Sequence, residues 1–104
     1  MYNIKDTICS IGINLNNEKD IRFICDYANK NNIGLSNRFY GIFYSLKSYK
    51  GNYATWMCPN GCGGYQFYVY PKDNFTRAGY KLIDIQELDI YENNKSCKFM
   101  NKVG

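Results

Sequence analysis

Residues 38–70 form a stretch that is rich in aromatic side chains and is interrupted by two turns that contain glycine. Short alternating runs of aromatic residues with glycine turns between them are typical of consecutive antiparallel strands. We therefore expect three central strands, over residues 38–46, 53–58 and 65–70. Pro71 would end the last of them, because proline has no N–H group to donate to a neighbouring strand.

The residues before this stretch predict one strand and one helix. In the segment 6–15, apolar residues alternate with polar or small ones, which indicates a strand with one buried face. Asn16 and Asn17 supply an N-cap, and the carboxylates that follow them suit the positive end of a helix. Apolar residues then recur at helical spacing from Ile21 to Ala28, and they predict a helix that is ended by Asn31, Asn32 and Gly34.

The residues after the stretch predict a short helix and a last strand. Asp73 would cap a single helical turn that Gly79 closes, and residues 80–85 alternate as a strand does. Residues 86–91 either extend that strand or begin a short helix. The remaining segment, 92–104, is polar, and we interpret it as a C-terminal tail.

Together these elements predict a single α+β domain over residues 1–91, followed by the tail. We expect a mainly antiparallel sheet of about five strands with one principal α-helix packed on one face. A chain of 104 residues is too short for two separately stable cores.

The charge of the chain is mildly positive. Lys and Arg number 13 against 9 Asp and Glu, which gives a formal net charge of +4, and the basic residues are scattered. This pattern allows an anionic partner such as a nucleic acid but does not require one. No apolar run is long enough to span a bilayer and the first residues lack the pattern of a secretory signal, so we expect an intracellular protein.

Cys58 and Cys62 flank a tight turn that resembles the knuckle of a zinc ribbon. Three residues separate them, where a knuckle has two, and the chain has no histidine. Cys97 is a third candidate ligand, and a fourth would have to come from the expected core. We interpret the five cysteines as free thiols in a reducing compartment. Bound zinc and a Cys58–Cys62 disulfide are the alternatives, and we expect no cofactor.

The sequence predicts no catalytic site. Because histidine is absent, a cysteine nucleophile would lack its usual base. Asp84, Glu87 and Asp89 could supply paired carboxylates, but at the end of a polar strand we interpret them as a solvated face. The chain has no phosphate-binding glycine loop and no dinucleotide motif. We expect a protein that is not an enzyme.

The candidate site consists of aromatic residues at alternate positions of the expected central strands, where they would share the outer face of the sheet with nearby arginines. The predicted partner-binding residues are Arg38, Tyr40, Tyr44, Trp56, Tyr68, Tyr70 and Arg77. Tyr, Trp and Arg are enriched at the energetic hot spots of protein interfaces. The same residues can also stack a base and contact its phosphate. The alternatives are a second small core under the C-terminal turn, or a homodimer interface.

Residues 79–88, GYKLIDIQEL, and the order of the predicted elements resemble small accessory proteins of bacteriophages and prophages. The abundance of Asn, Lys, Ile and Tyr, which is typical of AT-rich genomes, agrees with such an origin. The resemblance implies a protein that acts in the cytoplasm of an infected or lysogenic bacterium and blocks a defence protein or complex, as anti-CRISPR proteins do. It equally covers proteins that sequester a signalling nucleotide, and no catalytic residues carry over from it. We expect the first function, with a nucleotide-sequestering or nucleic-acid-binding module as the alternative.

Overall fold

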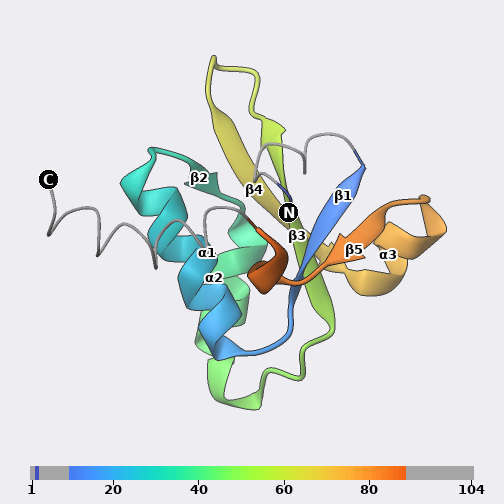
Figure 1. Cartoon of the computed structure of the whole chain (residues 1–104). Helices are drawn as coiled ribbons and strands as arrows, with labels where there is room; N and C mark the ends of the chain where they lie inside the picture. The colour runs from blue at the N-terminus through green and yellow to red at the C-terminus, as the bar shows by residue number, and fades with distance from the viewer. Residues whose placement is uncertain (1, 3–9, 89–104) are drawn as a thin grey trace, which may run out of the picture.

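A computed structural model describes residue 2 and residues 10–88, which form a sheet with helices on both faces (Figure 1). The strands are β1 (Ile11–Leu15), β2 (Gly34–Leu35), β3 (Tyr53–Pro59), β4 (Tyr65–Pro71) and β5 (Lys81–Ile83). The α-helices are α1 (Glu18–Lys30), α2 (Asn37–Tyr44) and α3 (Lys72–Arg77), and the 3-10 turns are η2 (Leu46–Ser48) and η3 (Ile85–Glu87). The α+β class is confirmed, but one principal helix was expected and the described residues contain three.

The sheet is mixed, and the prediction of a mainly antiparallel sheet is wrong. Its strand order is β2-β4-β3-β1-β5. β3 pairs antiparallel with both of its neighbours, whereas β1 pairs with β5, and β2 with β4, in parallel. Four strands therefore run in one direction and β3 runs against them. Residue alternation reports which face a side chain takes but not the direction of a strand, so it did not predict the parallel edges.

Two helical crossovers each join strands that run in the same direction but are not neighbours in the sheet. The chain passes from β1 through α1 to β2, and later from β4 through α3 to β5, and the two passages cross the sheet in opposite senses. Because such crossovers are nearly always right-handed, opposite senses place the two helices on opposite faces. Figure 1 shows α1 with α2 on one side of the sheet and α3 on the other.

The hydrophobic core lies between the sheet and the layer of α1 and α2. The side chains of this core are almost completely buried. The largest of them are those of Phe39, Phe67, Ile13, Leu15, Ile21, Ile24, Met57, Ile83, Ile85 and Leu88. The helix predicted to follow Asn16 and Asn17 is confirmed as α1, with Asn17 as its N-cap residue. Its N-terminus is held by two hydrogen bonds: the Asp20 amide donates to Asn17 Oδ1 at 3.1 Å, and the Asn16 amide donates to the Asp20 carboxylate at 2.9 Å.

Residues 38–46 do not form the predicted central strand, because most of them belong to helix α2. Phe39, Ile42 and Phe43 recur at the spacing of one helix face, and the first two of them are buried against the sheet. The sequence is aromatic at both even and odd positions here, so it fits a strand and a helix equally well. Packing against β4 decides in favour of the helix.

The other predicted strands are confirmed with small shifts. Those expected at 53–58 and 65–70 are the hairpin β3–β4, and the strand expected at 80–85 shortens to β5 before η3 begins. Of the strand expected at 6–15, only β1 is described. Residues 3–9 and 89–104, which include the predicted tail, lie outside the described part of the chain. None of the helices within residues 10–88 is both long and apolar enough to cross a membrane.

Candidate binding surface

The face of the sheet opposite α1 carries a cluster of aromatic rings centred on Trp56. Trp56 of β3 lies directly across the ladder from Tyr68 of β4 and diagonally from Tyr70. The ring centroids are 5.2 Å apart for Trp56 and Tyr68, and 5.3 Å apart for Trp56 and Tyr70. Neighbouring strands bring side chains within contact distance on a shared face, so the hairpin register itself builds this part of the cluster.

Helix α3 brings two more rings to the cluster. Phe75 of α3 packs edge-on against Trp56 with a centroid distance of 5.8 Å, and Tyr80, which follows the helix, lies 6.5 Å from Trp56 and 5.5 Å from Phe75. We call these five residues, Trp56, Tyr68, Tyr70, Phe75 and Tyr80, the aromatic surface. Edge-to-face and offset contacts at these distances are the favourable arrangements for aromatic pairs.

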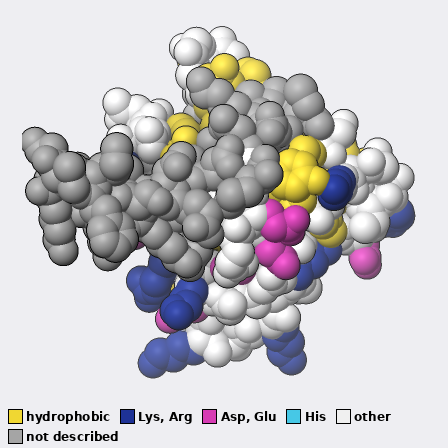
Figure 2. Space-filling view, viewed as in Figure 1, with side chains coloured by type: hydrophobic (Ala, Val, Ile, Leu, Met, Phe, Trp, Pro, Cys, Tyr) yellow, Lys and Arg dark blue, Asp and Glu magenta, His cyan; other side chains and the backbone are white. Residues whose placement is uncertain are grey.

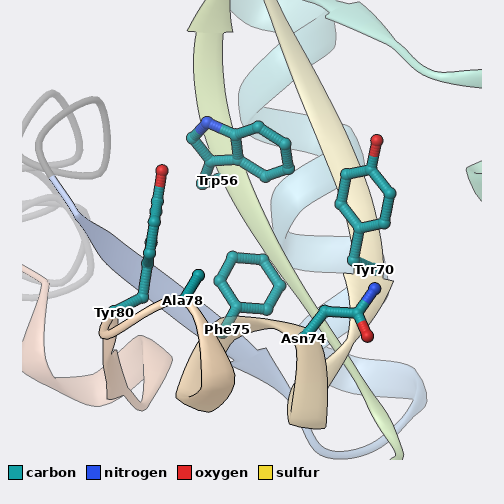
Figure 3. A pocket seen from close by; sticks show the side chains of 6 residues that line it. All are labelled: Trp56, Tyr70, Asn74, Phe75, Ala78 and Tyr80. Atoms are coloured by element: carbon teal, nitrogen blue, oxygen red, sulfur yellow. The ribbon is translucent and has the colours of Figure 1, made fainter.

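The aromatic surface contains a pocket of about 210 Å³ that is open to solvent. It is lined by Trp56, Tyr70, Asn74, Phe75, Ala78 and Tyr80. Figure 3 shows the rings of Trp56, Tyr70 and Tyr80 arranged around that of Phe75. Phe75 is almost completely buried, whereas 38% of the Tyr70 surface is exposed. The pocket therefore has a fixed floor and a wall that a ligand can reach.

Gly12 of β1 makes room for the floor of this pocket. A Cβ atom at this position would lie 2.7 Å from Cδ1 of Phe75 and 2.9 Å from Cδ2 of Leu82. Since real Cβ atoms do not approach other heavy atoms so closely, a side chain at residue 12 would push Phe75 outward. The absence of a side chain in β1 thus lets α3 lie close to the sheet and present its phenylalanine to Trp56.

Two arginines lie next to the aromatic surface. The guanidinium carbon of Arg38, at the start of α2, is 5.6 Å from the centroid of the Tyr70 ring, within the range of a cation–π interaction. Arg77 of α3 donates to Asn74 Oδ1 at 2.8 Å and to the backbone carbonyl of Asp73 at 3.3 Å. Asn74 is thereby held at the edge of the pocket, with its amide nitrogen on the Tyr70 side (Figure 3).

The structure brings together most, but not all, of the predicted site residues. Trp56, Tyr68 and Tyr70 share one face as predicted, with Arg38 beside them, and Arg77 reaches the pocket through Asn74.

Tyr40 and Tyr44 do not lie on the sheet face, because α2 is a helix; they are 53% and 92% exposed. Tyr44 instead borders a shallow groove of about 600 Å³ between α1 and the end of α2.

Sequence reasoning missed Phe75, Tyr80 and Ala78 as members of the site. The helical turn that carries Phe75 was predicted, and Phe75 is the only apolar residue of α3. That isolated apolar residue was a signal that the turn packs against something, but its target depends on the crossover from β4 to β5. The alternative of a small core under the C-terminal turn is partly realised here, because Phe75 covers one edge of Trp56 and leaves the pocket open beside it.

The cysteines of the β3–β4 hairpin do not form a metal centre within the described residues. Cys58 and Cys62 are free thiols, and no group of three or more His, Cys, Asp or Glu residues in residue 2 and residues 10–88 could hold a metal ion. The loop is ordered by Asn60, whose side-chain oxygen accepts hydrogen bonds from the amides of Cys62 and Gly64 at 2.8 and 3.2 Å. Cys97, the third predicted ligand, lies outside the described part of the chain.

Cys25, Asp84 and Glu87 are engaged in the fold through burial or hydrogen bonds. Burial raises the pKa of the Cys25 thiol to about 11, so little thiolate is present near neutral pH. The Asp84 carboxylate accepts hydrogen bonds from the side chains of Asn14 at 2.9 Å and Asn16 at 3.0 Å, which lower its pKa. The Glu87 carboxylate accepts from the Asp84 amide at 2.8 Å and caps η3.

No model of a protein family, no curated protein and no solved structure matches this chain.

Proposed function

We propose that this chain is a non-enzymatic inhibitor that docks its aromatic surface on a bacterial defence protein and blocks it. The observation that carries the binding part of the proposal is the open pocket between Trp56, Tyr70 and Phe75. Trp and Tyr, with Arg38 beside them, are the residue types that contribute most binding energy at protein interfaces. The rings already contact one another, so little side-chain entropy would be lost when a partner binds.

The defence protein as partner, and the cytoplasm of an infected bacterium as the place of action, follow from the resemblance to phage accessory proteins. That resemblance now rests on residues 79–88, because α2 replaces the first strand of the expected three-stranded meander. The segment 79–88 contributes Tyr80 to the aromatic surface and then forms β5 and η3.

Phage plating tests the proposal. The protein would be expressed in a panel of bacterial strains, each of which carries one active defence system, and challenged with a phage that the system restricts. We expect plaques to return in at least one strain. Tyr70→Ala should reduce this rescue, since losing a hot-spot side chain costs about 2 kcal/mol of binding, or roughly 30-fold in affinity.

Tyr44→Ala is the matched control, because it removes a tyrosine that is more exposed than Tyr70 and lies off the aromatic surface. It should rescue as well as the unmodified protein. Absence of rescue in every strain would contradict an anti-defence role, and equal rescue by the two variants would contradict the assignment of the surface.

A nucleotide-binding or nucleic-acid-binding module is the second candidate. It is favoured by two arginines that contact residues of the pocket, Arg38 at Tyr70 and Arg77 at Asn74, since stacking on aromatic side chains with arginine at the phosphate is a common way to hold a nucleotide. In Figure 2, however, the Lys and Arg side chains of the visible face are spread over its lower left, its lower edge and its right side and do not form one continuous patch.

Native mass spectrometry and salt dependence distinguish the two candidates. A retained nucleotide on the purified protein, or an affinity for single-stranded nucleic acid that falls steeply with salt, would support the second candidate over the first.

A further inference from the structure

We infer that the pocket of the aromatic surface receives one phenylalanine-like side chain from an acidic segment of the partner protein. This inference rests on the proposed function and specifies the chemistry of the partner at that site. It is carried by the size of the pocket, its lining and the charges beside it.

The size of the pocket suits one side chain. Its volume is about 210 Å³, which is below the roughly 300–1,000 Å³ of pockets that bury drug-sized ligands. A complete nucleotide would extend well beyond it. A single large side chain that projects from a peptide backbone would fill it and leave the backbone to run along the rim.

The lining of the pocket suits an aromatic guest. Three of the rings that line it, those of Trp56, Phe75 and Tyr80, already meet edge-to-face, which leaves ring faces and edges for a fourth partner. The side-chain amide of Asn74 adds a polar group at the edge, and its oxygen is already engaged by Arg77. A base would need hydrogen-bonding groups on its edge, and this lining offers few of them.

The charges beside the pocket suit acidic neighbours in the partner. β3 and β4, which carry most of the aromatic surface, contain no charged residue. Arg38 contacts Tyr70 and Arg77 contacts Asn74, two residues that lie next to each other at one end of the pocket (Figure 3), and Asp73 is the one carboxylate of α3. Carboxylates next to the inserted side chain would meet these guanidinium groups, which favours an acidic segment over a neutral or basic one.

Trp56 makes the test direct, because it is the only tryptophan of the chain. Its fluorescence would be titrated with three blocked peptides that lack tryptophan. The first has one phenylalanine flanked on each side by acidic residues, the second has alanine in place of the phenylalanine, and the third has lysines in place of the acidic residues. We expect the first peptide to change the emission of Trp56 and to bind at least about tenfold more tightly than the others, with an affinity that falls as salt is added.

Two variants, one on α3 and one just after it, test whether the peptide binds in the pocket. Ala78→Leu would fill the pocket from an exposed position that lines it and should weaken binding of the first peptide by about tenfold or more. Thr76→Leu adds an apolar side chain on α3 itself, also at an exposed position, but outside the lining, and should bind like the unmodified protein. Circular dichroism of each variant would establish that the fold is retained.

Several results would overturn the inference. Equal binding of the alanine peptide would exclude insertion of an aromatic side chain, and equal binding of the lysine peptide would exclude an acidic partner. Equal loss in both leucine variants would exclude the pocket as the binding place, and tighter binding of adenosine monophosphate than of any peptide would assign the pocket to a nucleotide. Phage rescue that depends on Tyr70, together with no peptide binding, would leave the proposed function standing and reject only this choice of guest.

Discussion

At the scale of single residues, the binding surface depends on a position that has no side chain. Gly12 lies in β1, remote in sequence from every ring of the aromatic surface, yet it sets how closely Phe75 can approach the sheet. Trp56 then depends on Phe75 for one of its edge contacts. A substitution in the first strand should therefore alter the environment of the tryptophan through one intervening ring.

Gly12→Ala should destabilise the protein by about 1–3 kcal/mol, because the new methyl group would overpack the contact with Phe75 and Leu82. It should also shift the fluorescence of Trp56. Urea unfolding and the emission spectrum measure the two effects. Gly34→Ala is the control, since a Cβ atom at this strand glycine would lie 3.5 Å from Gln66, at an ordinary contact distance. The same stability for both variants would contradict the role given to Gly12.

Asp84 should make the protein sensitive to acid. The hydrogen bonds from Asn14 and Asn16 lower its pKa below the ordinary carboxyl value, so the folded state holds the ionised form more strongly than the unfolded state does. Its contribution to stability is complete above the unfolded pKa and is lost as the pH falls through the folded pKa. Asp84→Asn should therefore be less stable near neutral pH and should lose less stability on acidification.

Asp20 should have the opposite effect on the pH dependence of stability, because its pKa is raised and not lowered. Burial raises its pKa in spite of the hydrogen bond from the Asn16 amide, so ionisation costs stability as the pH rises from the ordinary carboxyl pKa to the raised one. Asp20→Asn should remove that cost. Urea unfolding from the acid range to neutral pH would measure both variants, and parallel pH profiles for the two would contradict these assignments.

At the scale of elements, α2 is the segment for which sequence pattern was least informative. The spacing of Phe39, Ile42 and Phe43 fits a helix, while the alternation that includes Tyr40 and Tyr44 fits a strand. Burial separates the two interpretations, because Phe39 and Ile42 are buried whereas Tyr40 and Tyr44 point to solvent. The segment Glu18–Lys30 offered no such conflict, since a capped N-terminus and a single apolar stripe both indicated a helix.

Gly41 allows the helical state of α2 to be tested in solution. It lies inside the helix, and a Cβ atom there would meet no heavy atom within 4 Å. Gly41→Ala should therefore raise the free energy of unfolding by about 0.5–1 kcal/mol, and Gly41→Val by less, because β-branched residues are weaker helix formers. Urea unfolding measures both. A larger gain for valine than for alanine would indicate a strand at this segment.

At the scale of the whole molecule, the fold is one sheet crossed by two helical connections. β3 is the single strand that runs against the other four. β3 is the central strand, with β4 on one side and β1 on the other, whereas β2 is a two-residue edge strand. Strands buried within a sheet open mainly through global unfolding, and short edge strands open locally. The aromatic surface is built on β3 and β4, and so belongs to the stable part of the sheet.

Hydrogen exchange should follow this arrangement. The amides of β3 are expected to exchange slowest, near the rate set by global unfolding, and those of β2 much faster. Exchange measured by NMR, residue by residue, would show the difference. Equal protection of Gly34–Leu35 and Tyr53–Pro59 would contradict the placement of β2 at the edge of the sheet.

The sequence by itself determined the parts of this protein that depend on neighbours along the chain. Capping and apolar spacing specified α1, and glycine turns with alternation specified the hairpin β3–β4, which already places Trp56, Tyr68 and Tyr70 on one face. Only the tertiary structure decided that α2 is a helix, that both edges of the sheet are parallel, and that Phe75 completes a pocket over Gly12. These features depend on contacts between residues distant in sequence, and the local periodicity of the side chains does not report such contacts.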